Sequence, residues 1–154
     1  MFERLFRASA PEDMNFDEQR QWMVENQLRE WGIHDSRVLQ AMATVPRELF
    51  VPEWQREAAY YDGALAIGDG QTISQPYVVA HMSELLELQG DEKALEVGTG
   101  SGYQAAVLSG LVREVFSIEI KEPLHRRATD TLRRLGYANV RTLLARAEQS
   151  VERT

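Results

Sequence analysis

The sequence predicts an α/β fold in which a parallel sheet follows a helical N-terminal cap. Three observations lead to this prediction. Short apolar runs alternate with helical patterns over residues 91–144, which is typical of parallel strands joined by crossover helices. A glycine-rich segment, Gly98–Gly102, joins the first of these runs to a helix, as at the ligand-binding edge of such sheets. Residues 15–90 instead show mainly the periodicity of amphipathic helices.

The first helix is expected to begin after Asn15 and to end at Gly32. Asn15 is a common capping residue, and Glu18 three residues later completes the pattern of a capping box. Glycine is favoured just past the C-terminus of a helix. Between these ends, apolar residues recur at the spacing of one helix face, namely Val24, Leu28 and Trp31.

Further helices are expected before residue 90, separated by a loop. Asp35 is placed to cap a helix that ends before Pro46, and Glu53–Tyr60 fits a short helix. The three glycines of residues 61–75 predict the loop. Pro76 suits the first turn of the next helix, and Gly90 is placed to end it. The expected inward positions are Val38, Met42 and Val45 in the helix after Asp35, and Val78, Met82 and Leu85 in the helix after Pro76.

Three strands and two helices are expected in the remainder of the chain. The strands are a short buried one at Lys93–Val97, a second at Glu114–Ile120 and a third at Val140–Leu144. The helix after the glycine turn ends near Gly110. Pro123 begins the other helix and Gly136 follows its end, with inward positions Leu124, Ala128, Leu132 and Leu135. Right-handed crossovers between such strands make the sheet parallel.

Composition and charge limit the classes of function. The 154 residues fit one domain, which we expect at residues 15–154 after a flexible tail at residues 1–14. The formal net charge of −7 argues against binding to nucleic acid or to a membrane surface. No cysteine is present, no histidines have metal-ligand spacing, and neither a membrane span nor a signal peptide is evident. We therefore expect no metal site and a cytoplasmic location.

The segment Leu95–Gly102 carries the strongest signal for a ligand. Its glycines permit positive φ angles and a close approach of the backbone, and the following helix offers free N–H groups. Their spacing is G-x-G-x-G, not the G-x-G-x-x-G of dinucleotide-binding folds. Glu96 and Glu119 flank the turn, and two carboxylates suit the ribose and positive charges of S-adenosylmethionine better than a pyrophosphate. The alternatives are a turn that only connects strand and helix, and a Glu96 that is solvated or bonded to the turn.

Residues 68–76 form a second candidate site. Two glycines, the hydroxyls of Thr72 and Ser74, and two glutamines precede the helix that begins at Pro76. The backbone N–H groups and Ser74 Oγ can bind an anionic group, or Ser74 or Gln75 serves only as a helix cap. No G-x-S-x-G elbow surrounds Ser74, so we do not predict a hydrolase nucleophile.

With these motifs, the sequence resembles the protein-L-isoaspartate O-methyltransferases over about residues 23–140. The glycine turn alone indicates only an S-adenosylmethionine-dependent methyltransferase, whereas the block Thr72–Pro76 is much more specific to this family. The matching blocks are Met23-Val24-Glu25 with Gln27-Leu28, Val45-Pro46-Arg47 with Phe50-Val51-Pro52, Gly70–Pro76, Leu95–Ala106, and Leu135-Gly136-Tyr137 with Asn139-Val140.

The resemblance implies a Rossmann-like methyltransferase fold and methylation of the free carboxylate of L-isoaspartyl residues in damaged proteins, a repair reaction. It implies Ser74 as the catalytic residue, with Thr72 and Ile73 beside it in substrate binding. The residues expected to bind S-adenosyl-L-methionine are Glu96, Gly98, Thr99, Gly100, Ser101, Gly102 and Glu119. Isoaspartyl-containing peptides and proteins are the implied partners. The alternatives are a methyltransferase for another carboxylate and an impaired or inactive remnant of the family.

The resemblance ends near Leu144. The family continues with a Gly-Asp-Gly segment and a fourth strand, whereas a short polar tail, residues 145–154, follows here. We therefore expect an incomplete, truncated domain, with a helical cap at residues 15–90, a cofactor-binding half at residues 91–144 and part of the parallel sheet missing. The strand Lys93–Val97 then lies at the sheet edge, where it is a template for self-association.

Overall fold

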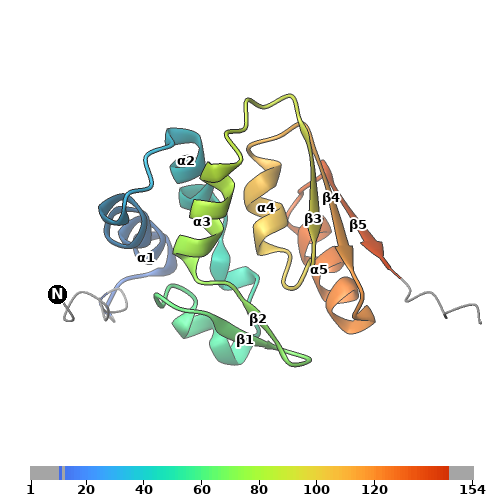
Figure 1. Ribbon diagram of the computed structural model, residues 1–154. Helices are drawn as coiled ribbons and strands as arrows, with labels where there is room; N and C mark the ends of the chain where they lie inside the picture. Colours follow the sequence, from blue (N-terminus) through green and yellow to red (C-terminus); the bar gives the residue numbers. More distant parts are fainter. Residues whose placement is uncertain (1–10, 12, 146–154) are drawn as a thin grey trace, which may run out of the picture.

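A three-stranded parallel sheet forms the C-terminal half of the described chain, as the strand–helix alternation predicts (Figure 1). The computed structural model describes residue 11 and residues 13–145, so the expected tails at residues 1–14 and 145–154 lie largely outside the described residues. The strands pair in the order β3-β4-β5 without a break in register. Their bounds are Lys93–Val97 for β3, Glu114–Glu119 for β4 and Val140–Leu144 for β5.

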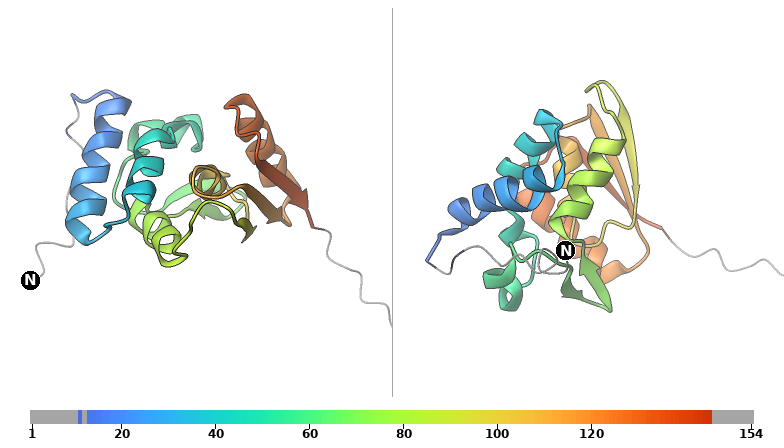
Figure 2. Two further views of the ribbon diagram at one scale, coloured as in Figure 1. Left: turned by 90° about the horizontal axis from the view of Figure 1, so that it is seen from above. Right: turned by 60° about the vertical axis from the view of Figure 1, so that its left-hand side comes forward.

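Both crossover helices, α4 (Tyr103–Ser109) and α5 (Glu122–Arg134), lie on the same face of the sheet (Figure 2, left). Right-handed connections require this, because β3, β4 and β5 follow one another in a single direction across the sheet. The predicted inward positions of α5 are confirmed: Leu124, Ala128 and Leu132 are buried, and Leu135 packs partly buried just past the helix end.

No helix of the described residues covers the opposite face of the sheet (Figure 2). Register partners in a parallel sheet share a face, and Val97, Ile118 and Leu143 form one such row. Leu95 is 65% exposed and Val97 is 81% exposed, so the prediction of a buried strand at Lys93–Val97 is wrong. An apolar run indicates a strand, but it does not indicate what lies beside it. Within residues 13–145, this strand lies at the sheet edge, as predicted.

The N-terminal helix begins as predicted, with a complete capping box. Asn15 Oδ1 accepts from the Glu18 N–H at 3.0 Å, and Glu18 Oε2 accepts from the Asn15 N–H at 2.8 Å. Gly32, at φ +97°, ends the helical region. Trp31 is 36% exposed, so its predicted inward position is wrong, because a π-helical turn shifts the residues after it around the axis. The segments are α1 (Phe16–Met23), the π-helical η2 (Val24–Leu28) and the 3-10 turn η3 (Arg29–Trp31).

The second helix, α2 (Ser36–Thr44), is capped by Asp35, whose Oδ1 accepts from the backbone N–H groups of Arg37 and Val38. Its predicted inward positions are all buried. Two 3-10 turns follow Pro46, the second where a short helix is predicted: η4 (Arg47–Leu49) and η5 (Glu53–Ala58).

The predicted loop at residues 61–75 contains an antiparallel hairpin, so that prediction is wrong in part. Strands β1 (Leu65–Gly68) and β2 (Gln71–Ile73) pair around Asp69 and Gly70, at φ +54° and +69°. A tight two-residue hairpin turn requires positive φ at both central residues, and Asp-Gly is one of the sequences that it prefers. The hairpin lies at the end of the molecule where β3 and β4 have their carboxyl ends (Figure 1).

Helix α3 (Pro76–Leu85) begins with Pro76 as predicted but buries a different face. Val79, Ala80 and Ser83 are buried, whereas Val78, Met82 and Leu85 are 39%, 58% and 67% exposed. The prediction of those three as the inward stripe is therefore wrong. The helix is apolar around most of its circumference, so spacing alone does not select the buried face. It also ends at Leu85, well before Gly90.

One hydrophobic core joins the two halves of the described chain. Met23, Leu28 and Met42 from the first helices pack in the same cluster as Tyr103 and Leu124. Helices α1 and α2 lie alongside α3 and α4, so the part of the N-terminal half at the carboxyl ends of the strands is the hairpin with η5 beside it (Figure 1). Within the described residues, no helix is long and apolar enough to cross a membrane.

Candidate active site

The glycine turn leaves β3 sharply and enters α4. Gly98, Gly100 and Gly102 have φ angles of +95°, +54° and +86°, which residues with a Cβ adopt at a cost. The Gly98 N–H donates to the Ile118 carbonyl at 2.7 Å, which fixes the turn against β4. A Cβ on Gly102 would lie 3.2 Å from Leu132 Cδ1, so the third glycine also permits close packing of α5.

Glu96 lies on β3 just before this turn, and its carboxyl is held by two hydroxyls in sequence. Ser117 Oγ, opposite Glu96 in the sheet register, donates to Glu96 Oε2, and Thr99 Oγ1 lies 2.6 Å from Ser117 Oγ. Burial raises the pKa of Glu96 to about 7, although the bond from Ser117 acts in the opposite direction. Glu96 therefore changes charge near neutral pH.

Glu119, at the end of β4, is the second acid expected at the turn. Its carboxylate is buried and accepts backbone N–H groups from Gly100 at 2.9 Å, Ile120 at 2.8 Å and Lys121 at 2.9 Å. Burial alone would raise the pKa of Glu119, but these three donors hold it below its usual range. The two predicted acids therefore differ: Glu119 is ionised at neutral pH, whereas Glu96 is close to its midpoint.

The second predicted site lies between the hairpin and α3. Ser74 follows β2 and is exposed, while its backbone carbonyl accepts a hydrogen bond from Arg47 Nη2 at 2.7 Å. Gln75 occupies the cap position of α3 without a capping bond, because its Nε2 donates to Asp62 Oδ1 at 2.7 Å instead. The interpretation of Gln75 as a side-chain cap is therefore wrong.

The structure brings the two predicted sites together around one cavity of about 370 Å³. From the hairpin side it is lined by Thr72, Ile73 and Ser74, and from the sheet side by Glu96, Gly98, Thr99, Gly100 and Ser101. Gly102 and Glu119 are not on its wall. They support the turn, one by packing against α5 and the other by its bond to Gly100. The cavity thus has acceptors for a cationic or hydroxyl-bearing ligand at one side and a hydroxyl donor at the other.

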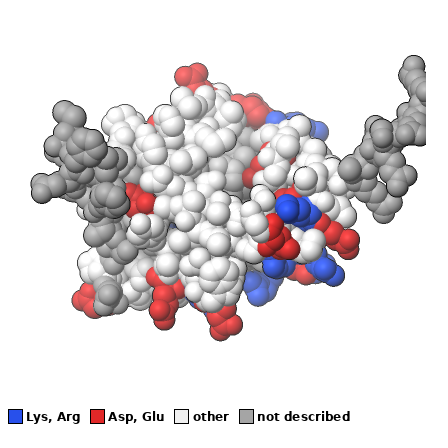
Figure 3. Space-filling model, turned by 60° about the horizontal axis from the view of Figure 1, so that its bottom comes forward, with Lys and Arg blue, Asp and Glu red and all other residues white. Residues whose placement is uncertain are grey.

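The hairpin is tied to α5 beneath the glycine turn. Arg127 Nη2 lies 2.5 Å from Asp69 Oδ2, and Lys121 Nζ donates to the Asp69 carbonyl at 3.1 Å. Figure 3 views the molecule from the hairpin end and shows basic and acidic groups mixed over part of this face. These contacts link the turn of the hairpin, whose second strand leads to Ser74, to the first half of α5.

Two supporting residues were not predicted as part of the site. Arg47 stands in a matching block of the family, but nothing in its local sequence indicates a contact with Ser74. Ser117 is the more predictable of the two, because aligning the expected strands in parallel register places it beside Glu96.

No group of three or more His, Cys, Asp or Glu side chains that could hold a metal occurs in the described part of the chain.

The chain is similar in sequence to one family of known proteins. The family model of protein-L-isoaspartate(D-aspartate) O-methyltransferase (PCMT) matches residues 18–153. A protein-L-isoaspartate O-methyltransferase 1 of Syntrophobacter fumaroxidans is 60% identical over 127 residues, 82% of this chain and 59% of that protein. A protein-L-isoaspartate O-methyltransferase 2 of Shewanella sediminis is 54% identical over 142 residues, 91% and 58% of the two chains. The chain thus spans less than two thirds of the length of these relatives.

Solved structures agree with the sequence comparison. A protein-L-isoaspartate O-methyltransferase superimposes with a TM-score of 0.73 at 29% identity, covering 84% of this chain and 42% of that one. A PCMT protein from Plasmodium falciparum, solved in complex with S-adenosyl-L-homocysteine, superimposes with a TM-score of 0.69 at 24% identity. That alignment covers 86% of this chain and 66% of the other, and it supports the α/β fold.

Proposed function

Because the chain belongs to the protein-L-isoaspartate(D-aspartate) O-methyltransferase family, we propose that it transfers a methyl group from S-adenosyl-L-methionine to the free carboxylate of an L-isoaspartyl residue in a damaged protein. The observation that carries this proposal is the shared cavity, which Ser74 lines from one side and the glycine turn with Glu96 from the other. In this proposal residues 15–90 supply the substrate side of the site and residues 91–144 the cofactor side.

The residues around the turn fit the proposed cofactor. On Gly98, the space that a Cβ would enter has no atom within 4 Å, so the backbone is open to a ligand there. S-adenosyl-L-methionine supplies a methyl group activated by a sulfonium, and its positive charge and ribose hydroxyls match carboxylate acceptors. The Plasmodium falciparum neighbour, solved with S-adenosyl-L-homocysteine, supports the same cofactor class. We assign cofactor binding to Glu96, Gly98, Thr99, Gly100, Ser101, Gly102 and Glu119.

Ser74 is proposed as the catalytic residue on the substrate side. The acceptor carboxylate is already ionised at neutral pH, so the reaction needs no strong general base. The rate then depends on placing a carboxylate oxygen in line with the methyl group and on removing water from it. The exposed Ser74 hydroxyl can donate a hydrogen bond to that carboxylate, and Thr72 and Ile73 form the adjoining wall. Ser74 orients the nucleophile and is not itself the nucleophile.

We expect Ser74→Ala to lower methyl transfer about tenfold or more while leaving affinity for S-adenosylhomocysteine nearly unchanged, because a hydrogen bond to a charged group is lost only on the substrate side. Transfer of labelled methyl to an isoaspartyl peptide measures the first quantity, and calorimetric titration measures the second. Ser36→Ala is the matched control, because Ser36 is an exposed serine in the first turn of α2, away from the cavity.

The same assay separates the proposed function from its alternatives when the aspartyl form of the peptide is run in parallel. Transfer selective for the isoaspartyl peptide supports the proposal. Equal transfer to both peptides would indicate a methyltransferase for other carboxylates, and no transfer by a folded chain would indicate an inactive member of the family. Full activity of Ser74→Ala would remove Ser74 from the mechanism.

No strand of the described residues pairs with the outer edge of β3, and we propose that two copies of this chain associate by pairing their β3 strands there. An edge strand presents unpaired backbone N–H and C=O groups, and this one carries the exposed Leu95 and Val97. Light scattering should give about twice the 17.6 kDa of one chain at high concentration, and Leu95→Lys should shift the population to the monomer. A monomer at all concentrations would contradict this proposal.

A further inference from the structure

Arg47 is the largest fully buried side chain of the described residues, and it touches the backbone of Ser74. Its Nη2 donates to the Ser74 carbonyl at 2.7 Å, and its Nε donates to the Ala59 carbonyl at 2.7 Å. The guanidinium carbon lies 4.8 Å from the centre of the Tyr103 ring, a cation–π contact. One side chain therefore has directed contacts with three separate segments.

Two of these three segments, those of Ser74 and Tyr103, must be aligned for the proposed transfer. Ser74 lies on the proposed substrate side of the cavity, and Tyr103 is the first residue of α4, directly after the glycine turn. Ala59 is the residue that follows η5. The rigid fork of an arginine can hold two carbonyls at fixed directions, which the single ammonium of a lysine cannot do. Arg47 thereby sets the position of Ser74 relative to the turn assigned to the cofactor.

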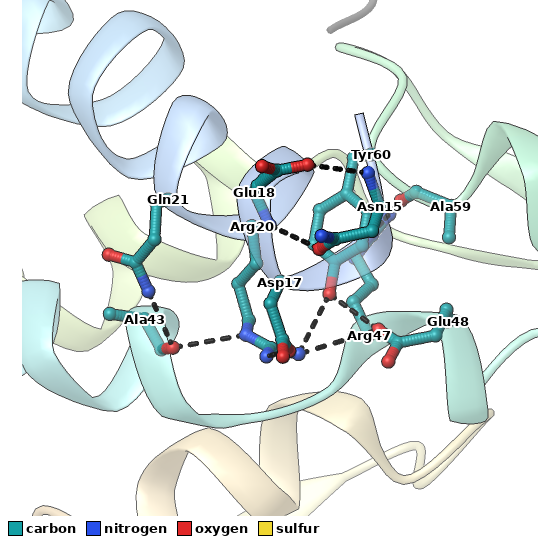
Figure 4. Close-up of polar contacts among 10 residues, drawn as sticks. All are labelled: Asn15, Asp17, Glu18, Arg20, Gln21, Ala43, Arg47, Glu48, Ala59 and Tyr60. Atoms are coloured by element: carbon teal, nitrogen blue, oxygen red, sulfur yellow. Dashed lines mark hydrogen bonds and ion pairs between the residues drawn. The ribbon is translucent and has the colours of Figure 1, made fainter. Parts of the chain in front are cut away.

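The charge of Arg47 is not balanced inside the described chain. The neighbouring carboxylate, Glu48, is committed elsewhere: it accepts from Tyr60 Oη at 2.5 Å and lies 3.6 Å from Arg20 Nη1 (Figure 4). Arg47 forms no ion pair with the described residues, and its buried Nη1 has no hydrogen-bond partner. Burying an unpaired cation is costly. The two carbonyls and the Tyr103 ring offset part of this cost, and a carboxylate bound at Ser74 would offset more of it.

We propose that Arg47 is a positioning residue for the carboxylate substrate: it fixes the backbone of Ser74 and places a positive charge behind it. This inference rests on the proposed function, and it adds to that function a reason why the site prefers an anionic acceptor. Arg47 does not line the cavity. In this proposal it therefore acts through the backbone of Ser74 and through its charge, and not by contact with the substrate.

The test compares Arg47→Met, Arg47→Lys and a control, Arg37→Met. Arg37 also donates to two carbonyls, those of Leu88 at 2.7 Å and Leu111 at 2.8 Å, but it lies away from the cavity. In Arg47→Met we expect KM for the isoaspartyl peptide to rise about tenfold or more, with affinity for S-adenosylhomocysteine within about twofold. Arg47→Lys, which keeps the charge and loses the fork, should give a smaller rise. A purely structural role would reduce the active fraction and so lower kcat without changing KM.

Amide hydrogen exchange gives a readout that needs no activity. We expect exchange at residues 71–75 to become faster in Arg47→Met and to stay unchanged in Arg37→Met. Unchanged exchange at residues 71–75, or an unchanged KM in an active protein, overturns the inference. If the unsubstituted chain transfers no methyl group, the proposed function fails, and the exchange result alone then decides whether Arg47 positions Ser74.

Discussion

A protein carrying Glu119→Ala is expected to bind S-adenosylhomocysteine about 10- to 150-fold more weakly than the unsubstituted chain. That range corresponds to charged hydrogen bonds of about 1.5–3 kcal/mol. Glu119 Oε2 accepts from Gly100 in the centre of the glycine turn, and a carboxylate that binds three N–H groups retains acceptor capacity for a ribose hydroxyl. Alanine removes both the support of the turn and that acceptor. Calorimetric titration with S-adenosylhomocysteine measures the change.

The control for this prediction is Glu119→Gln, which keeps the shape and one acceptor oxygen but removes the charge. We expect its affinity to fall between those of the alanine variant and the unsubstituted chain. Near-ultraviolet circular dichroism establishes that each variant retains its tertiary packing. An alanine variant that is folded and binds with unchanged affinity would remove Glu119 from the cofactor site.

The second large effect is a loss of stability as the pH rises through the titration of Glu96. The pKa of Glu96 is about 7 in the folded chain, against an ordinary value of 4.5. Between these values the folded chain binds a proton that the unfolded chain releases, so stability falls with increasing pH in that window. At about 1.4 kcal/mol for each unit of pKa, the fall from pH 4.5 to pH 7 is at most roughly 3 kcal/mol. Urea unfolding at a series of pH values measures it.

Glu96→Gln is expected to remove this pH dependence, because the amide does not titrate and can still accept from Ser117. Glu114 and Glu119 have lowered pKa values, so they affect stability at lower pH. Their contribution to the free energy of unfolding is lost only as the pH falls below 4.5, the ordinary pKa of a glutamate. A Glu96→Gln variant with the same slope between pH 4.5 and pH 7 as the unsubstituted chain would contradict the assignment to Glu96.

The fold of residues 91–144 could be predicted because its signals are local. Glycines of positive φ, a proline at a helix start and a strict i, i+4, i+8 stripe each act within a few residues, and β3, α4, β4, α5 and β5 follow them. The hairpin was missed although Asp69-Gly70 between Leu65, Ile67 and Ile73 is a recognised hairpin signal. Its strands of four and three residues are too short for their alternation to stand out from a glycine-rich loop.

Burial and long-range contacts could not be predicted from the same patterns. Both faces of α3 are apolar, so the choice of Val79 over Val78 depends on which helices pack against it. The sequence indicates two separate candidate sites, and only the fold places Ser74 and Glu96 around one cavity. The role of Arg47 depends on carbonyls 12 and 27 residues away, which no local motif encodes.

We expect the proposed pairing of two β3 strands to become stronger as ionic strength rises. Two copies that pair through β3 bring the exposed Leu95 and Val97 of each copy into one joined sheet, but each copy also carries a formal net charge of −7. At low salt this like charge repels over distances beyond the contact, and at 0.1 M salt the Debye length shortens to about 10 Å. Added salt therefore weakens the repulsion while leaving the apolar contribution intact, so we expect the proportion of paired chains to rise with salt concentration.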